Sequence, residues 1–226
     1  MKTIVISIGG SVILSKDIDF QYYKKLADLI MRIAKDYKIY IIVGGGKIAR
    51  DYIKIGRKLN FDEKTLDIFG ILVTRINAKL LTNIINNSNS KIPETTDNAL
   101  KMKNRIIIMG GTIPGHSTDY VGSEIASKTK AEKFIIATNV NGVYDKDPKE
   151  YNDAKQIVEI TPDKLINKYG ISWKSAGCNV VIDGPALNVI KNKDLLTYVV
   201  NGKNIQELEK VLLDKKFNGT VIKNKK

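Results

Sequence analysis

Short apolar runs, rich in β-branched residues, recur along the chain of 226 residues and alternate with segments whose apolar residues repeat every three or four positions. The runs are apolar throughout instead of alternating with polar residues, which is typical of parallel strands buried on both faces. The predicted strands are Ile4–Ile8, Ile39–Val43, Arg105–Met109, Phe134–Thr138, Thr197–Val200 and Thr220–Ile222.

The segments between these runs have the apolar period of helices. A first stripe extends over Phe20–Tyr37, a second helix begins near Ala49, a long third one covers Leu66–Ile84, and the last covers Ile205–Leu212. Strand and helix alternate, so the pattern predicts an α/β fold in which a doubly wound sheet carries helices on both faces.

The chain contains no linker rich in Pro, Gly or Ser and no internal repeat. We therefore expect residues 1–226 to form one domain with two lobes. Asn86–Thr96 and Lys146–Asn152 are predicted to be surface loops, whereas Asn167–Asp183 has no clear pattern.

Composition excludes several classes of protein. With 43% hydrophobic and 27% charged residues the chain is globular and not disordered, and its longest apolar stretches are far too short to span a bilayer. The single cysteine, Cys178, permits no internal disulfide, and the first residues do not resemble a signal peptide, so a cytoplasmic location is expected. The net charge of +13 attracts polyanions, but the lysines are dispersed, which is typical of a solvated surface.

Three glycine clusters each follow a predicted strand: Gly9-Gly10-Ser11, Gly44–Lys47 and Gly110-Gly111-Thr112. Ligands of open α/β sheets bind beyond the carboxyl ends of the strands, where glycine lets backbone N–H groups approach a phosphate. Three such clusters at equivalent strand ends predict a phosphate site. None has the spacing of a P-loop or of the dinucleotide fingerprint, so distributed loops are expected to hold the phosphates.

Charged residues near these clusters suit the same chemistry. Lys47 and Arg50 share a face at the start of the second helix, where cations oppose the helix dipole unless an anion binds there. They could also be solubilising surface charges. Asp67, in the third helix with Arg75 eight residues on, could bind a ligand or serve only as a dipole partner.

Two polar loops complete the candidate site. Gly110–Asp119 offers hydroxyl groups, an aspartate and the only histidine, although one of Ser117, Thr118 or Asp119 could simply cap the next helix. Thr138–Pro148 joins an aromatic side chain to polar ones, which suits a nucleoside.

These motifs together resemble one family. The Gly-Gly-Ser, the Gly-Gly-Gly-Lys-x-Ala-Arg, the Thr-Arg-x-Asn-Ala of Thr74–Ala78, the Gly-Gly-Thr-x-Pro-Gly-His-x-Thr-Asp and the Thr-Asn-Val-x-Gly-Val-Tyr-x-x-Asp-Pro resemble archaeal-type UMP kinase, a member of the amino-acid kinase (carbamate-kinase-like) superfamily. The resemblance covers nearly the whole chain, in the order of the family.

The resemblance implies a three-layer αβα sandwich with a mostly parallel central sheet. It implies transfer of the γ-phosphoryl group of ATP to UMP, giving UDP and ADP, with Mg²⁺, in pyrimidine nucleotide synthesis. It also implies a homohexamer built from dimers. From the short apolar stretches and the dispersed charge, no membrane or specific nucleic-acid partner is expected, and no metal-ligating residues are assigned. By motif match, the ATP-binding residues would be Gly9, Gly10, Gly45, Arg50, Thr138, Asn139, Tyr144 and Asp147.

The acceptor side follows from the same match. UMP would be bound by residues of the second glycine cluster, the third helix and the loop after the third strand, namely Gly44, Asp67, Thr112, Ile113, Pro114, Gly115, His116, Ser117 and Thr118. Phosphoryl transfer needs positioning and charge neutralisation more than covalent chemistry. We expect Lys47 and Arg50 to neutralise phosphate charge, and Asp119 and Asp183 to position magnesium or orient cationic groups. His116 need not act as a base, because a phosphate oxygen is already a nucleophile.

Three positions depart from the wider superfamily. Ser7 and Asn188 stand where many members carry lysines, and Asn141 replaces the usual aspartate. Lys191, one helical turn after Asn188, could substitute for one of these lysines.

Two other interpretations remain open. A kinase of the same superfamily could act on acetylglutamate or isopentenyl phosphate. Alternatively, the basic chain could be a non-catalytic module that binds nucleotides or RNA, although it has no platform of interleaved aromatic and basic residues.

Overall fold

The computed structural model describes residues 1–14, 19–148, 150–170 and 181–225, and all six predicted strands are present. Together with β7, which was not predicted, they form one seven-stranded sheet of order β3-β2-β1-β4-β8-β9-β7. The strands are β1 (Lys2–Ile8), β2 (Tyr37–Val43), β3 (Ile106–Met109), β4 (Lys133–Thr138), β7 (Glu159–Ile160), β8 (Thr197–Asn201) and β9 (Gly219–Ile222). The first five in this order are parallel, and β9 runs antiparallel to β8.

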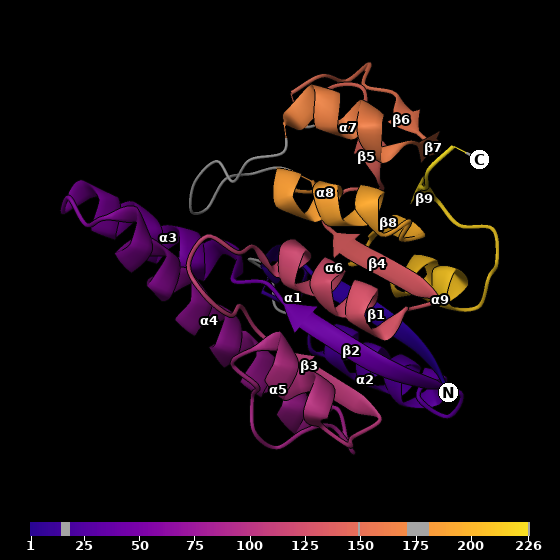
Figure 1. Ribbon diagram of the computed structural model, residues 1–226, viewed down its shortest axis with the longest axis horizontal. Coiled ribbons are helices and arrows are strands. Elements are labelled where there is room, and N and C mark those ends of the chain that lie inside the picture. Colours follow the sequence, from indigo (N-terminus) through magenta and orange to yellow (C-terminus); the bar gives the residue numbers. More distant parts are fainter. Residues whose placement is uncertain (15–18, 149, 171–180, 226) are drawn as a thin grey trace.

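Helices cover both faces of this sheet, as Figure 1 shows, with α6 and α8 in front of the strands and α2 and α9 behind them. The αβα sandwich with a mostly parallel sheet is thereby confirmed. The helices are α1 (Gly10–Ile13), α2 (Phe20–Ile33), α3 (Gly46–Lys58), α4 (Glu63–Ile84), α5 (Thr96–Lys101), α6 (Thr118–Thr129), α7 (Pro162–Tyr169), α8 (Gly184–Asn192) and α9 (Ile205–Leu212). A separate short ribbon pairs β5 (Val143–Tyr144) with β6 (Gln156–Ile157).

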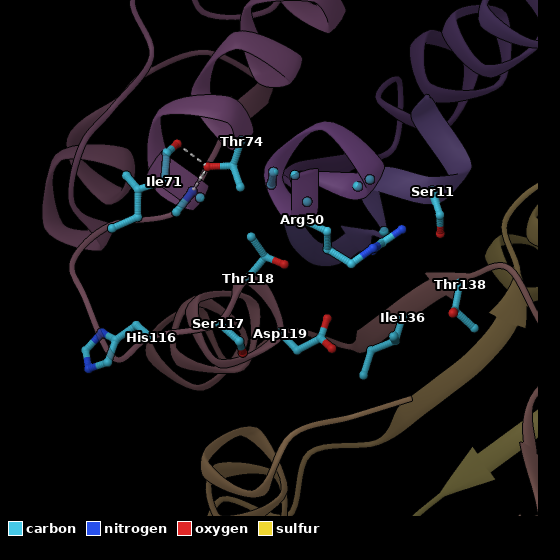
Figure 2. A pocket seen from close by; sticks show the side chains of 18 of the residues that line it. Ser11, Arg50, Ile71, Thr74, His116, Ser117, Thr118, Asp119, Ile136 and Thr138 are labelled. Atoms are coloured by element: carbon cyan, nitrogen blue, oxygen red, sulfur yellow. Dashed lines mark hydrogen bonds between the residues drawn. The ribbon is translucent and has the colours of Figure 1, made fainter. Parts of the chain in front are cut away.

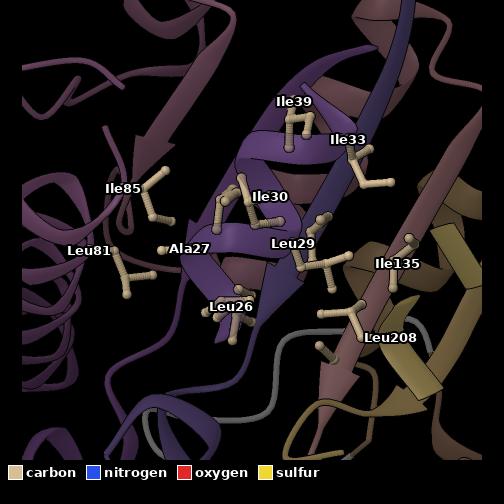
Figure 3. Packing of buried hydrophobic residues seen from close by; sticks show 14 of the residues in the cluster. Leu26, Ala27, Leu29, Ile30, Ile33, Ile39, Leu81, Ile85, Ile135 and Leu208 are labelled. Carbon is tan, nitrogen blue, oxygen red and sulfur yellow. The ribbon is translucent and has the colours of Figure 1, made fainter. Parts of the chain in front are cut away.

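Alternate residues of each strand face the two helical layers. Ile4 and Ile6 of β1 belong to a cluster with α2 and α9, whereas Val5 belongs to a cluster with α6 and α8. In the first cluster Leu26 and Ile30 of α2 pack on the sheet (Figure 3). Burial on both faces explains why the strands read as continuous apolar runs.

Several predicted boundaries were wrong. The first stripe is too long at its C-terminal end: α2 begins at Phe20, as predicted, although this side chain is exposed, but it ends at Ile33, and Tyr37 opens β2. Asp19 caps this helix by accepting a hydrogen bond from the Gln21 N–H. In α4 only part of the apolar stripe is buried, because Leu66 and Val73 lie in the interior whereas Ile76 is 67% exposed.

The C-terminal third contains elements that periodicity did not predict. Helix α7 follows its cap Thr161, and α8 follows its cap Asp183 with a proline in its first turn. Residues 171–180, which include Cys178 and most of the unassigned segment Asn167–Asp183, lie outside the described residues. No helix in the described ranges combines the length and apolar character needed to cross a membrane.

Strand β1 marks the topological switch of the sheet. From β1 the chain builds β2 and β3 on one side and then returns to build β4 and β8 on the other. Ligands of open α/β sheets bind at such a switch, beyond the carboxyl ends of the strands. The ends of β1 and β4 therefore mark where a ligand site is expected.

Candidate functional site

A cavity of about 250 Å³ lies at this switch point, at the carboxyl ends of the strands. It brings together residues that are far apart in the sequence but were predicted to share a site. The predicted residues among its lining are Gly9, Gly10, Gly44, Gly45, Arg50, Asp67, His116, Ser117, Thr118, Asp119, Thr138 and Asn139.

The first two glycine clusters touch each other backbone to backbone. A Cβ atom at Gly10 would lie 2.0 Å from the Gly46 nitrogen and 2.6 Å from the Gly44 carbonyl oxygen. The Gly44 N–H donates to the Ile8 carbonyl at 2.8 Å, which ties the second loop to the end of β1. Glycine is therefore required at Gly10 by close approach of two loops.

The side chains of Arg50 and Lys47, both at the start of α3, lie in different surroundings. The Arg50 side chain extends across the cavity toward Ser11 (Figure 2) and is the only lysine or arginine among the described lining residues. Lys47 is exposed and forms an ion pair with Asp51 one turn further along the helix. The structure thus brings Arg50 to the cavity and leaves Lys47 at its outer surface.

Two partly buried carboxyl groups lie at this site: Asp119 lines the cavity, and Asp183 is next to it. The Ser7 hydroxyl donates to Asp119 Oδ1 at 2.6 Å, and the Ser117 hydroxyl donates to Asp183 Oδ2. Burial and then the neighbouring charge of Asp183 raise the pKa of Asp119 to about 7, against the lowering effect of the Ser7 hydrogen bond. Burial also raises the pKa of Asp183 above its usual value. Ser7, noted above as a departure from the resemblance, is thus a hydrogen-bond partner of Asp119.

Ser117 and Asp183 also cap the N-termini of helices. Ser117 caps α6 by accepting from the Tyr120 N–H at 2.9 Å, and Asp183 caps α8 by accepting from the Ala186 N–H at 3.0 Å. Ser117 therefore both caps α6 and lines the cavity, so the two interpretations of this residue do not exclude each other. Asp183 lies next to Asp119 but does not line the cavity itself.

Asp67 is joined to the loop that follows β3. Its Oδ2 atom accepts a hydrogen bond of 2.6 Å from the Gly115 N–H, and burial raises the pKa of its carboxyl group. His116 packs against the Tyr120 ring, with 4.3 Å between ring centroids, and its side chain points outward in Figure 2. The segment Thr112–Gly115 lies at the rim and does not line the cavity in the described part of the chain.

A second cavity of about 230 Å³ adjoins the first and shares Thr138 and Asn139 with it. Tyr144 and Asp147, which the resemblance assigns to the adenine nucleotide, line it. Sequence reasoning missed Lys168, whose Nζ atom donates to the Tyr144 carbonyl at 3.1 Å and to the Asp145 carbonyl at 2.6 Å. Lys168 lies in α7, and without a prediction of that helix no pattern could place it here.

The loop between these cavities is fixed by amide groups. Asn141 Oδ1 accepts from Asn201 Nδ2 at 3.0 Å, so the amide at this departure from the superfamily has a partner. Gly142 has φ +155°, and a Cβ atom there would lie 2.5 Å from Thr220 Oγ1.

One turn of α4 holds the glycine loops in place, and sequence reasoning gave its residues no role. Thr74 Oγ1 accepts from the Gly111 N–H at 2.7 Å and donates to the Ile71 carbonyl (Figure 2). Arg75 donates to the Gly111 carbonyl at 3.3 Å, and Asn77 donates to the Gly44 carbonyl at 2.8 Å. Their only signal in the sequence was the motif Thr-Arg-x-Asn-Ala.

Helix α8 keeps its polar residues away from both cavities. Lys191 Nζ lies 2.5 Å from Asp163 Oδ1 of α7, and Asn188 accepts from Asn192 at 3.1 Å. Neither Lys191 nor Asn188 lines either cavity in the described part of the chain.

The described residues contain no group of three or more His, Cys, Asp or Glu side chains that could hold a metal ion. Mg²⁺ commonly keeps several water ligands and is bound by one or two carboxylates together with substrate phosphates. The Asp119 and Asp183 carboxyl groups fit that pattern, in which the phosphates supply much of the coordination.

The fold and the glycine-lined cavity at its switch point are those of an α/β protein with a candidate phosphate site, and the sequence matches the model of the Amino acid kinase family over residues 2–201. The chain belongs to that family. It is 39% identical to a uridylate kinase of Methanobrevibacter smithii over 222 residues, which are 97% of this chain and 98% of the relative.

Solved structures of two such kinases are similar to this structure over nearly its full length. The crystal structure of uridylate kinase from Archaeoglobus fulgidus superposes with a TM-score of 0.85 at 36% identity, covering 97% of this chain and 99% of that one. The structure of UMP kinase from Ureaplasma parvum gives a TM-score of 0.77 at 26% identity, covering 99% of both chains.

Proposed function

We propose that this protein is a UMP kinase, which transfers the γ-phosphoryl group of ATP to UMP and releases UDP and ADP in pyrimidine nucleotide biosynthesis. The observation that carries the proposal is the pair of adjoining cavities: a glycine-lined one that contains Arg50 and a second one lined by Tyr144 and Asp147. Two anionic substrates can meet there in line, and its relatives named as uridylate kinases share nearly its full length.

The two cavities hold different parts of the two substrates. The adenosine of ATP occupies the cavity of Tyr144, Asp147, Thr138 and Asn139, and its phosphates extend toward Gly9, Gly10, Gly45 and Arg50. UMP occupies the other side, where Asp67 is tied to the loop of residues 112–118 and Gly44 approaches its phosphate. The N-terminal lobe of this single domain would then bind mainly the acceptor, and the C-terminal lobe mainly ATP.

The chemistry needs few protein groups. A UMP phosphate oxygen attacks the γ-phosphorus, a new P–O bond forms, and the bond to the ADP oxygen breaks. Arg50 and the backbone N–H groups of the glycine loops stabilise the charge on the transferring group, with Lys47 at the outer edge of the site. Magnesium, when bound, would neutralise phosphate charge beside Asp119 and Asp183. The Ser7 and Ser117 hydroxyls orient these two carboxyl groups.

The α3–α4 hairpin carries an apolar face that suits a second copy of the chain. It carries most of the large apolar side chains that are exposed in the described part of the protein, at spacings of three or four along α3 and of four along α4. This face, called here the α3–α4 face, comprises Ile48, Tyr52, Ile55, Leu59, Phe61, Ile68, Leu72, Ile76 and Leu80. Soluble monomers rarely expose contiguous apolar patches of this kind, and symmetric pairing of two such faces would bury them.

This pairing would be the dimer from which a homohexamer is built. The hairpin projects from one end of the molecule in Figure 1, where a second hairpin can reach it. The inner sides of the same helices line the cavity through Arg50 and Asp67, so pairing would also support the acceptor site. We place the enzyme in the cytoplasm, where a chain with one cysteine and no disulfide is expected.

A screen of phosphoryl acceptors tests the function. ADP release would be measured with ATP and Mg²⁺ against UMP, CMP, acetylglutamate and isopentenyl phosphate, each at several concentrations. UMP should give the highest kcat/KM. Turnover of acetylglutamate or isopentenyl phosphate in preference to UMP would replace the proposed acceptor within the same family, and no turnover of any of the four would refute the assignment as a kinase of these substrates.

A further inference from the structure

The glycine loop that opens α3 has the backbone shape of an anion-binding nest. Gly45 has right-handed helical angles, with φ −82° and ψ −28°, and Gly46 follows with φ +68°. A right-handed residue followed by a left-handed one turns successive N–H groups toward a common point, and the N-terminus of a helix adds its dipole. Whether the N–H groups or the carbonyl oxygens face the cavity depends on how each peptide unit is turned.

Asn77 of α4 holds these peptide units from behind. Its Nδ2 atom donates to the Gly44 carbonyl oxygen at 2.8 Å and lies 3.4 Å from the Gly45 carbonyl oxygen. Both neighbours are pure acceptors, so the amide nitrogen must be the atom that faces them. Asn77 is 2% exposed and does not line the cavity, whereas Gly44, Gly45 and Gly46 do.

The geometry of the peptide bond turns this contact into an orientation. In a trans unit the C=O and N–H bonds point in opposite directions, and the units here are trans. When Asn77 draws the Gly44 oxygen back toward α4, the Gly45 N–H turns to the opposite side, toward the cavity. No described residue accepts a hydrogen bond from that N–H, so it is available to an anion.

A buried asparagine in mid-helix has an energetic cost unless its amide is used. Asparagine is a poor helix former, and a buried amide must find partners. Its neighbours on the buried side of α4 include Val73, Ala78 and Leu81, so an apolar side chain would suit the helix itself. An apolar replacement would leave the Gly44 carbonyl without this donor and remove the restraint on the loop.

We propose that Asn77 is a positioning residue for phosphate binding, which holds the Gly44 and Gly45 carbonyls away from the cavity and so presents the N–H groups of the glycine loop to the substrate phosphates. The inference rests on the proposed function in one respect: the cavity binds a nucleotide through its phosphates. It assigns Asn77 no contact with substrate.

The test compares a ligand with phosphates to one without them. N77D keeps the shape of the side chain but, when ionised, cannot donate, and N77A removes the amide. N83A is the matched control, because Asn83 Nδ2 donates to the Lys79 carbonyl at 2.7 Å on the exposed side of the same helix. Each full-length variant would be titrated calorimetrically with ATP and with adenosine, and its thermal unfolding recorded.

We expect the Kd for ATP to rise at least tenfold in N77D and N77A, the Kd for adenosine to stay within twofold of wild type, and N83A to match wild type for both ligands. An ATP affinity within twofold of wild type in N77D overturns the proposal. A parallel loss of ATP and adenosine affinity, or loss of the folded state in N77D, also overturns it, since both indicate a purely structural role. If N77A alone unfolds, N77D decides.

The titration is independent of the acceptor. A wild-type protein that binds ATP but does not phosphorylate UMP would refute the proposed UMP kinase reaction, while the comparison of ATP with adenosine would still decide the role of Asn77.

Discussion

Replacing Asp119 with asparagine should change how the stability of the protein depends on pH. Burial raises the pKa of this carboxyl group from 3.8 to about 7, with a further contribution from the charge of Asp183. The folded state therefore binds the proton more tightly than the unfolded chain does. The contribution of Asp119 to the free energy of unfolding is therefore highest below pH 4, falls as the pH rises toward 7, and becomes constant above it.

The size of the effect follows from the shift. A rise of about 3 units at about 1.4 kcal/mol per unit gives an upper limit of about 4 kcal/mol. Asp119 keeps partial contact with the cavity, so we expect roughly half of this value. D119N lacks the titrating proton but can still accept from the Ser7 hydroxyl. Relative to wild type, it should gain about 2 kcal/mol between pH 4.5 and pH 8.

Urea denaturation of both proteins at half-unit steps between pH 4.5 and pH 8.5 measures this difference. D97N is the matched control, because hydrogen bonding and attraction from Lys128 lower the pKa of Asp97. Asp97 is exposed, so D97N should change the pH dependence of the free energy of unfolding only weakly, and in the opposite direction to D119N. A difference between D119N and wild type that stays constant within about 0.5 kcal/mol over this range would refute the reasoning, as would a difference that grows toward low pH.

Three further predictions concern the site and its surroundings. R50A should lower kcat/KM for UMP phosphorylation at least tenfold, or about 1.4 kcal/mol. K47A should have a smaller effect, because Lys47 pairs with Asp51 outside the cavity. Equal effects of the two variants in steady-state kinetics would contradict this placement. G10A should lower the free energy of unfolding by about 1–3 kcal/mol, because its Cβ atom would meet the Gly46 nitrogen at 2.0 Å. G9A, with its nearest atom at 3.4 Å, should unfold close to wild type in the same urea titration, and a G10A protein as stable as G9A would count against the contact. I76E should reduce the assembly to smaller species in sedimentation velocity, whereas V158E, equally exposed but off the α3–α4 face, should not; an unchanged I76E assembly would exclude that face as the interface.

The sheet and the placement of the glycine loops could be predicted from the sequence because both depend on local signals. Strands such as Ile39–Val43 are buried on both faces, so their apolar runs are continuous. Glycine at strand ends reflects close backbone approach, which the structure shows between Gly10 and Gly46. The positions of Asp67 and Asp119 beside these loops follow once the strands are known to be parallel.

What could not be predicted depends on contacts between distant segments. The period of α4 suggested that Ile76 and Leu80 face the core, but they are exposed, and Thr74 and Asn77 are buried in their place. Those two polar residues are inside because Gly111 and Gly44 need hydrogen-bond partners there. The exposed apolar residues belong to the α3–α4 face, so the helix has two apolar surfaces and a single periodicity cannot distinguish them. Lys168 was missed for a similar reason, because its helix was not predicted.

The distribution of charge explains why these loop contacts matter. The chain carries a net charge of +13, yet Arg50 is the only lysine or arginine among the described residues that line the first cavity. Ser7, at the end of β1, carries no charge and donates a hydrogen bond to Asp119. Substrate phosphates must therefore be stabilised largely by backbone N–H groups and helix N-termini, which are fixed dipoles and act only when correctly turned. In such a site a residue that orients the loop, the role proposed for Asn77, would contribute to phosphate binding without touching the substrate.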